Sequence, residues 1–342
     1  MNPSSSFITP GMAPIKKVGR FLLYRELGRG AIGTVYFGHD PVIDRDVAIK
    51  IFHNLPSAHE KKQRDQIFMN EARAAGRLSH PNIITIFDAA TDANVSFIAM
   101  EYLQGQDLRQ FLADNKPLPY LIAAQMLQRI AEGLEYAHSE GVIHRDIKPA
   151  NIFIQENMQA KLVDFGIARA VKRETSEGNK DQPATLFNNN ILGTPNYMSP
   201  EQAQAKPVDK LTDIYSFGAV MYEMLVRQKP FQSRDMDSLI HMIVHKQIKA
   251  PHETNPEIPL VLSRIVMKAM SKQPEKRYQS AAEIALELRR YVLTEKREQK
   301  IDASKGNQSD KKTGEPYGRL FWLSCIAITI AAFVVVSSWL GK

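Results

Sequence analysis

The sequence predicts a two-lobed α+β protein, with a small strand-rich lobe, a larger helical lobe and an apolar helix near the C-terminus. Residues 20–103 alternate short β-type runs with one helical stretch, whereas residues 104–293 show mainly helix-period apolar positions. Residues 320–340 contain no charged side chain. With 44% hydrophobic and 24% charged residues among 342, the chain has the composition of a packed globular protein rather than a disordered one.

The first lobe follows a short arm. Residues 1–19 contain a serine run and several prolines, so we expect a flexible N-terminal arm. The β-type runs are 21–27, 34–40, 46–52, 83–89 and 95–103. A helix is expected near 60–78, where Ala, Glu, Lys and Arg are frequent.

The second lobe is expected to be mainly helical, with a β-like run at 151–154. Its helix-period segments are 121–140, 212–226, 260–270 and 281–296. Residues 294–319 have almost no apolar side chains and mix Lys, Glu, Asp, Ser and Gly, which is typical of a solvated tether.

The tether leads to a candidate membrane span at residues 320–340. At about 1.5 Å per helical residue this segment is roughly 31 Å long, close to the hydrocarbon thickness of a bilayer. Trp322 and Trp339 stand near its ends, where interfacial aromatic residues are expected. The alternative, a buried core helix, would usually keep a polar stripe. We therefore expect contact with a lipid bilayer.

Charge and cysteine usage limit the partners and the compartment. Lys311, Lys312 and Arg319 precede the span and Lys342 follows it, so the N-terminal part is expected in the cytoplasm, with the C-terminus across the membrane. No sensor domain is expected beyond the span.

The basic residues behind the net charge of +7 are scattered among acidic residues, which argues against a nucleic-acid partner. The lone Cys325 excludes an internal disulfide.

A glycine cluster lies between the first two β-type runs. Gly28, Gly30 and Gly33 form a GxGxxGxV pattern, which alone could be a turn. A dinucleotide fingerprint would open a helix, but residues 34–37 continue as β-type sequence. The pattern therefore predicts a strand–loop–strand flap whose backbone N–H groups approach phosphates closely.

Lys50 and Glu71 form a candidate pair. Lys50 ends the run VAIK, and Glu71 lies in the helical stretch NEARAAGRL. Separately they could be a strand-end charge and a solvated helix residue. As a pair, Lys50 would bind phosphate oxygens while Glu71 holds its ammonium in place.

The segment 144–151, HRDIKPAN, precedes a second acidic motif, DFG, at 164–166. Asp146 can accept the proton of an attacking hydroxyl, and Lys148 can neutralise a transferring phosphoryl group. Asn151 and Asp164 supply oxygen ligands for Mg²⁺. A merely polar loop would not explain these residue types at these spacings.

The motifs GRGAIGTV, VAIK, HRDIKPAN, DFG, GTPNYMSPE and DIYSFG occur in one order over about residues 20–293. The chain thus resembles eukaryotic-type (Hanks-type) serine/threonine protein kinases, in particular the bacterial membrane-anchored PknB-like kinases. The resemblance implies a bilobal protein-kinase fold, ATP with Mg²⁺ (or Mn²⁺), and protein substrates with Ser or Thr acceptors. It also implies a signalling role at a bacterial inner membrane.

The resemblance assigns further residues to nucleotide binding and support. The glycines would cover the ATP phosphates, and Val35 and Ala48 would cover the adenine. Met100 would be the gatekeeper, and the backbone of the hinge, Glu101, Tyr102 and Leu103, would bind the adenine edge. Glu201, in SPE instead of the family's APE, would form a buried ion pair with Arg277. Asp213 would brace the catalytic loop.

The resemblance also bears on acceptor and regulation. Lys148 and Thr194 are residues typical of the serine/threonine branch of the family, so the resemblance implies a seryl or threonyl acceptor. Arg145 could pair with a phosphate on Thr175, Ser176 or Thr185, which lie in the segment after DFG. Asparagines at 188–190 stand where PknB-like kinases have paired threonines, which leaves autophosphorylation open.

Two other functions stay as alternatives. A pseudokinase scaffold at the membrane would keep the fold without transfer, and a small-molecule phosphotransferase would have no need of the SPE and DIYSFG segments. A homodimer is left open.

Overall fold

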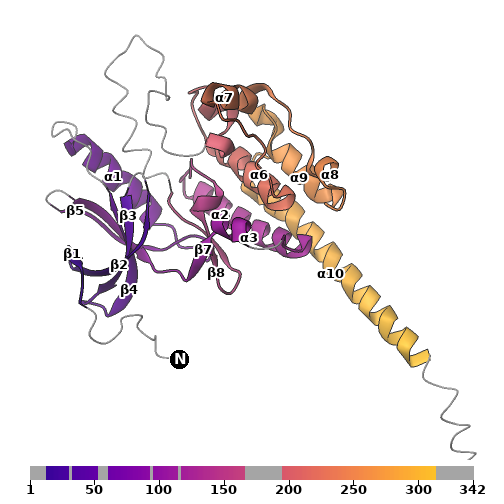
Figure 1. Ribbon diagram of the computed structural model, residues 1–342, viewed down its shortest axis with the longest axis horizontal. Helices are drawn as coiled ribbons and strands as arrows, with labels where there is room; N and C mark the ends of the chain where they lie inside the picture. Colours follow the sequence, from indigo (N-terminus) through magenta and orange to yellow (C-terminus); the bar gives the residue numbers. More distant parts are fainter. Residues whose placement is uncertain are drawn as a thin grey trace, which may run out of the picture. The chain divides into compact units, whose positions relative to one another are not determined.

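The computed structural model describes residues 13–30, 33–52, 61–92, 95–114, 117–165 and 195–312. Strands gather in a small lobe and most helices in a larger one (Figure 1), which confirms the predicted bilobal architecture. The small lobe contains a six-stranded antiparallel sheet in the order β1-β2-β3-β4-β6-β5. Its strands are β1 (Lys16–Val18), β2 (Phe21–Arg29), β3 (Gly33–Asp40), β4 (Arg45–Phe52), β5 (Ile86–Asp92) and β6 (Val95–Glu101).

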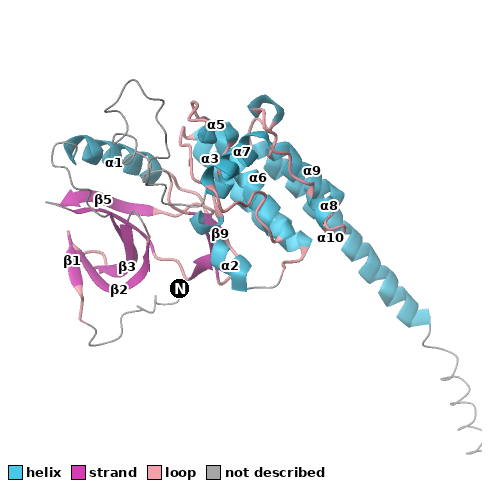
Figure 2. Cartoon of the chain, turned by 45° about the horizontal axis from the view of Figure 1, so that its top comes forward, coloured by secondary structure: helices cyan, strands magenta, loops and turns pink. Residues whose placement is uncertain are grey.

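The two faces of this sheet have different side chains because successive residues of a strand point to opposite sides. One face forms the hydrophobic core of the lobe, made of Val18, Phe21, Leu23, Val47, Ile49, Ile51, Phe97 and Ala99. The alternate residues of β4, Ala48 and Lys50, therefore lie on the other face. Helix α1 (Lys61–Gly76) runs beside the sheet near β5 (Figure 2).

Strand β1 falls within the expected flexible arm, residues 1–19. Lys16 pairs with Leu23 and Val18 with Phe21, and the Val18 side chain joins the core. The arm was predicted from its prolines and serines, which end before this strand. Residues 1–12 lie outside the described part of the chain.

A second, three-stranded sheet positions the catalytic segment. It consists of β7 (Gly105–Asp107), β8 (Ile152–Gln155) and β9 (Ala160–Leu162), all antiparallel. Residues 82–84, between α1 and β5, pair with β9: Ile84 N–H donates to the Leu162 carbonyl at 2.9 Å, and Leu162 N–H donates to the Asn82 carbonyl at 2.8 Å. This backbone pairing connects the small lobe to the start of the DFG motif.

The large lobe packs around α6, which is buried along most of its length and apolar on nearly all sides, as a central helix must be. Its helices are α2 (Leu108–Asp114), α3 (Tyr120–Ser139), α5 (Pro200–Ala203), α6 (Lys210–Val226), α7 (Met236–His245), α8 (Pro251–Thr254), α9 (Leu260–Ala269) and α10 (Ala281–Lys312). Short 3₁₀ turns cover Pro149–Asn151, Pro195–Tyr197 and Pro274–Lys276. The four helical segments expected from periodicity are all present.

Helix α10 extends further than predicted. Residues 294–312, assigned to a solvated tether, are helical. Glu, Lys, Arg and Gln, which predominate in residues 294–300, have high intrinsic helix propensity, so the helix continues past the predicted boundary. Within the described residues, none of the helices combines the length and apolarity needed to cross a bilayer. The candidate span 320–340 lies outside those residues.

Candidate active site

Four of the predicted nucleotide-binding residues share one face of the small-lobe sheet. Val35 of β3 lies opposite Lys50 of β4, and Ala48 lies opposite Met100 of β6. This is the face turned away from the hydrophobic core. Ala48 and Met100 are buried, and Lys50 is the charged group among them. The arrangement provides an apolar surface for a flat ring with a cation beside it.

The glycine-rich turn joins β2 to β3. Gly30 N–H donates to the Gly33 carbonyl at 2.9 Å, while residues 31–32 lie outside the described part of the chain. A Cβ on Gly33 would lie 2.3 Å from the Ile51 carbonyl oxygen, so this glycine is required by the close approach of β4. At Gly28 a Cβ would meet nothing within 4 Å. The open backbone around Gly28 and Gly30 suits a phosphate, whereas Gly33 serves packing.

The hinge after β6 is fixed by an ion pair that sequence reasoning missed. Lys161 of β9 lies 2.8 Å from the Glu101 carboxylate, and Glu101 N–H donates to the Thr85 carbonyl at 2.9 Å. Leu103, two residues on, is buried. The side chain of Glu101 therefore anchors the hinge through Lys161, and its N–H is bound to the Thr85 carbonyl. Nothing in the spacing of Lys161 signals this contact.

Asp213 braces the catalytic loop, as the resemblance implied. Its carboxylate is fully buried and accepts the N–H groups of His144 at 2.8 Å and Arg145 at 2.7 Å. His138 of α3 hydrogen-bonds the same carboxylate at 2.9 Å. Arg145 adopts a left-handed conformation with φ of 64°, which is costly for a residue with a Cβ. The bonds to Asp213 hold this conformation.

His144 links the catalytic loop to the DFG motif. It is fully buried, and burial lowers its pKa, so the ring is neutral at pH 7. Its Nε2 lies 3.0 Å from the Val163 carbonyl and its Nδ1 lies 3.3 Å from the Asp146 amide nitrogen. A neutral ring with the proton on Nε2 satisfies both contacts. His144 thus links the backbone of Asp146 to Val163, the residue before Asp164.

The three predicted catalytic-loop side chains meet at one carboxylate. Lys148 Nζ lies 2.7 Å from Asp146 Oδ2, and Asn151 Nδ2 donates to the same oxygen at 3.0 Å and to the Asp146 carbonyl at 2.8 Å. Both side-chain contacts use Oδ2, which leaves Oδ1 to accept a hydroxyl proton. The carboxylate is fixed but still partly exposed, at 31%.

Lys50 and Asp164 are ion-paired. Lys50 Nζ lies 2.7 Å from Asp164 Oδ1. Removal from water alone would raise the pKa of Asp164, but the charge and hydrogen bond of Lys50 outweigh it and lower that pKa. Asp164 is therefore ionised, and it adopts a left-handed conformation with φ of 61°. Strained residues of this kind are typical of functional sites.

The predicted Lys50–Glu71 pair is not formed. Glu71 instead accepts a hydrogen bond from Arg145 Nη1 at 3.2 Å, while Lys50 pairs with Asp164. Two carboxylates compete for two cations here, and motif spacing does not decide between the pairings. The Glu71–Arg145 contact is partly exposed, and such pairs contribute about 1 kcal/mol or less. The Lys50–Asp164 pair, in which Lys50 is only 12% exposed, would also have to break for the expected pairing to form.

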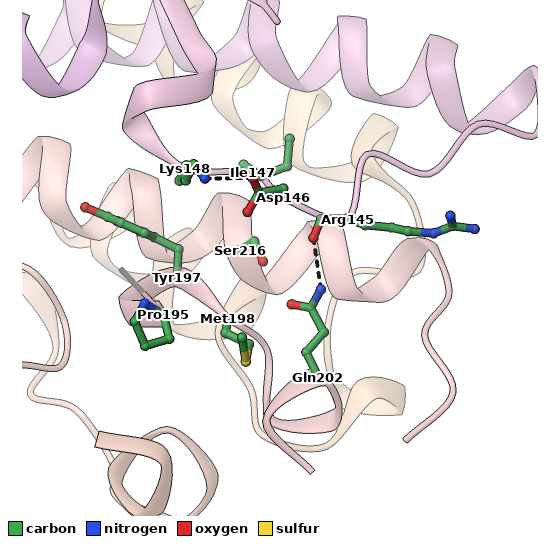
Figure 3. A pocket seen from close by; sticks show the side chains of 9 residues that line it. All are labelled: Arg145, Asp146, Ile147, Lys148, Pro195, Tyr197, Met198, Gln202 and Ser216. Carbon is green, nitrogen blue, oxygen red and sulfur yellow. Dashed lines mark hydrogen bonds and ion pairs between the residues drawn. The ribbon is translucent and has the colours of Figure 1, made fainter. Parts of the chain in front are cut away.

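A pocket lies beside the Asp146 carboxylate. Figure 3 shows Asp146 and Lys148 on one side and the segment after residue 194 on the other. The lining residues are Arg145, Asp146, Ile147, Lys148, Pro195, Tyr197, Met198, Gln202 and Ser216. A hydroxyl group entering this pocket would meet the carboxylate, and apolar surface from Pro195 and Met198 would contact its neighbours.

The predicted ion pair between Glu201 and Arg277 is confirmed. Arg277 Nη1 and Nη2 lie 2.7 and 2.8 Å from the two Glu201 oxygens, a bidentate geometry. Both residues are buried. Together they fix the start of α5, and with it the far wall of the pocket, to the segment that precedes α10.

The regulatory residues predicted after DFG are not described. Thr175, Ser176 and Thr185 lie in 166–194, outside the described residues, as does Thr194, a residue typical of the serine/threonine branch. Arg145, their expected partner, is described and pairs with Glu71.

The donor set fits a hard divalent cation. Asn151 uses its amide nitrogen on Asp146, which leaves the amide oxygen as a ligand, and Asp164 is an ionised carboxylate. Among the described residues no group of three or more His, Cys, Asp or Glu could hold a metal ion. A cation here would therefore be shared between two protein oxygens and substrate phosphates, as Mg²⁺ commonly is.

Comparisons with known proteins agree with this geometry. Residues 21–288 match the family model described as the protein kinase domain. A probable serine/threonine-protein kinase of Clostridium acetobutylicum is 36% identical over 272 residues, covering 79% of this chain and 39% of that protein. PrkC of Bacillus subtilis is 33% identical over 272 residues, covering 79% and 40%. PknB of Mycobacterium leprae is 36% identical over 277 residues, covering 79% and 42%.

A solved structure shares the fold. The crystal structure of the Mycobacterium tuberculosis PknI kinase domain superimposes with a TM-score of 0.63 at 24% identity, covering 81% of this chain and 98% of that one. The chain spans about two fifths of the length of the curated relatives it matches. Members of this family use ATP and a divalent metal ion. Catalytic loop, DFG motif and small-lobe sheet therefore place this chain in the protein kinase family, and it resembles the bacterial PknB-like serine/threonine kinases.

Proposed function

We propose that the chain is a membrane-anchored serine/threonine protein kinase that transfers the γ-phosphoryl group of ATP to protein hydroxyls in signalling. The main observation is the catalytic-loop geometry: Lys148 and Asn151 hold the Asp146 carboxylate beside an open pocket. Lys50 and Asp164 lie together at 2.7 Å, so the phosphate-binding cation and the metal-binding carboxylate are adjacent.

In this proposal each group has a separate task. Asp146 Oδ1 accepts the proton of a Ser or Thr hydroxyl as the oxygen attacks the γ-phosphorus. The bond from that phosphorus to the β–γ bridging oxygen breaks, and ADP leaves. Lys148 stabilises the negative charge on the transferring group, and Lys50 binds the phosphates of the nucleotide. The Val35, Ala48 and Met100 surface holds the adenine ring.

Asn151 and Asp164 would hold the divalent ion, Mg²⁺ in our proposal with Mn²⁺ as an alternative. The ion would neutralise phosphate charge in the transition state. Asn151 also donates to Asp146, so one side chain would connect the metal ligand set to the base.

The test compares the full chain with Asp146→Asn. Each is incubated with Mg²⁺- or Mn²⁺-ATP and a generic basic protein, and nucleotide affinity is measured in parallel with a fluorescent ATP analogue. We expect transfer by the parent alone and similar nucleotide affinity in both. Binding without transfer in the parent would favour the pseudokinase scaffold. Transfer to small hydroxyl compounds but not to protein would favour the small-molecule phosphotransferase.

The anchor in this proposal is residues 320–340. The support is its lack of charge, its terminal tryptophans and the basic residues before it. In bacterial inner membranes the catalytic part would then lie in the cytoplasm, where an anchor raises its concentration near membrane-bound substrates.

Fractionation tests the anchor directly. The full chain should stay in the membrane pellet after alkaline carbonate washing, and a chain truncated after residue 319 should not. Ile330→Arg places a charge at the centre of the span, which costs about 2.5–3.5 kcal/mol on insertion scales, and should release part of the chain. Retention of the truncated chain, or recovery of the full chain in the supernatant, would reject the anchor.

Regulation is proposed through the segment after DFG. A phosphate on Thr185, Thr175 or Ser176 would compete with Glu71 for Arg145. Unchanged activity and phosphate content in Thr185→Ala would remove Thr185 from this proposal. Light scattering at two protein concentrations would decide the homodimer.

A further inference from the structure

Gln202 occupies an unusual place beside the pocket. It lies in the first turn of α5 and is 5% exposed. The Gln202 side-chain oxygen accepts the Ser199 backbone N–H at 3.1 Å, and the Gln202 backbone N–H donates to Ser199 Oγ at 3.3 Å. These reciprocal bonds form a capping box, which fixes the Gln202 amide with its oxygen toward Ser199.

The other end of the Gln202 amide contacts the catalytic loop. Nε2 donates to the backbone carbonyl of Arg145 at 2.9 Å, as Figure 3 shows. Asp213 accepts the N–H of the same Arg145 at 2.7 Å. The peptide groups on both sides of this left-handed residue are thus bound, one from α6 and one from α5. A non-glycine residue in this conformation costs about 1–2 kcal/mol, so it needs such support.

We propose that Gln202 is a positioning residue that, together with Asp213, holds the Arg145 backbone and thereby aims the Asp146 carboxylate at the pocket. Ser199 assists by orienting the Gln202 amide. The proposal rests on the proposed function, because its consequence is a rate of phosphoryl transfer. It also accounts for the SPE variant: an alanine at the position of Ser199 would have no oxygen to accept the Gln202 N–H.

The first test is Gln202→Glu. The introduced carboxyl keeps an acceptor for the Ser199 N–H but places an oxygen against the Arg145 carbonyl. We expect kcat to fall about tenfold while the KM for ATP changes less than about twofold. Gln204→Glu makes the same charge change at the exposed end of α5 and serves as the matched control, with kcat unchanged.

A pH series gives a readout that a purely structural role would not move. Once protonated, the introduced carboxyl has an O–H that can donate to the Arg145 carbonyl. The ratio of variant to parent kcat should therefore rise as the pH is lowered. A constant ratio would contradict the proposal.

Amide hydrogen exchange in the full chain tests the contact without any activity. Exchange of residues 143–150 should be faster in Gln202→Glu, and in the uncharged Gln202→Met, than in the parent or the Gln204→Glu control. An inactive parent would refute the proposed function, while this measurement would still decide the role of Gln202. Unchanged exchange would overturn the inference. So would a parent-like kcat, or an equal loss of kcat and ATP binding together with a lowered Tm.

Discussion

Replacing Arg277 by Met should destabilise the large lobe by about 3–5 kcal/mol, the usual cost of removing one partner from a buried ion pair. Arg277 is 2% exposed, and all five of its guanidinium N–H donors are used. Two donate to Glu201, and the others donate to the carbonyls of Ser271, Leu211 and Lys272.

The magnitude follows from what the substitution leaves behind. The Glu201 carboxylate would keep the Thr212 hydroxyl at 2.8 Å but lose two charge-assisted hydrogen bonds, each worth about 1.5–3 kcal/mol. Three carbonyls would also lose a donor. For a domain of this size each kcal/mol lowers the Tm by about 2–4 °C, so a fall of about 6–20 °C is expected.

Thermal and urea unfolding, followed by circular dichroism, measure this loss. The double variant with Glu201→Gln should be less destabilised than the two single variants added together, because both remove the same interaction. Arg277→Lys should also be destabilised, since an ammonium cannot reproduce the planar fork of donors. A loss below about 1 kcal/mol in Arg277→Met would show that this ion pair contributes no more than a surface pair.

The same ion pair has a defined pH dependence. Burial alone would raise the pKa of Glu201, but the hydrogen bonds and charge of Arg277 outweigh it and lower that pKa. A carboxylate with a lowered folded pKa adds stability that is present above the unfolded pKa, about 4.3, and is lost as the pH falls through the folded value. In Arg277→Met only burial remains and raises the pKa of Glu201, so the difference in stability between parent and variant should be largest above that raised pKa and should shrink as the pH falls through it towards the lowered pKa of the parent.

Two further outcomes are expected. Lys161→Met removes the ion pair to the hinge Glu101 at 2.8 Å and should weaken binding of a fluorescent ATP analogue about three- to tenfold; unchanged affinity would contradict the role given to this pair. Gly105→Ala should lower the Tm strongly, because Gly105 has φ of +138° and an added Cβ would lie 2.0 Å from the Ile154 carbonyl oxygen. Gly76→Ala, where a Cβ meets nothing within 4 Å, is the control that should not destabilise.

Local patterns in the sequence predicted much of the fold and the catalytic loop. Helix period identified four helices of the large lobe, α3, α6, α9 and the first part of α10, because their apolar residues recur at helix spacing. The short spacing from Asp146 to Asn151 leaves the chain few ways to separate these side chains, and they meet at one carboxylate. The resemblance located the contacts of Asp213 and Glu201, which are distant in sequence from their partners.

Other features depend on tertiary geometry that no motif encodes. Lys50 and Arg145 each have a choice of carboxylate, and their pairing with Asp164 and Glu71 follows from the position of α1. The Gln202 contact with the catalytic loop requires α5 to lie against it. The continuation of α10 reflects intrinsic helix propensity, which a composition typical of a tether does not exclude.

The most direct test of the central claim is the transfer of labelled γ-phosphate from ATP to protein, followed by phosphoamino-acid identification, in the full chain and in Asp146→Asn. We expect phosphoserine or phosphothreonine with the parent and a loss of at least a hundredfold in the variant, the usual scale of general-base catalysis. Both proteins should bind nucleotide equally. Transfer that persists in Asp146→Asn, or a parent that binds ATP with Mg²⁺ or Mn²⁺ but labels no hydroxyl residue, would contradict the central claim.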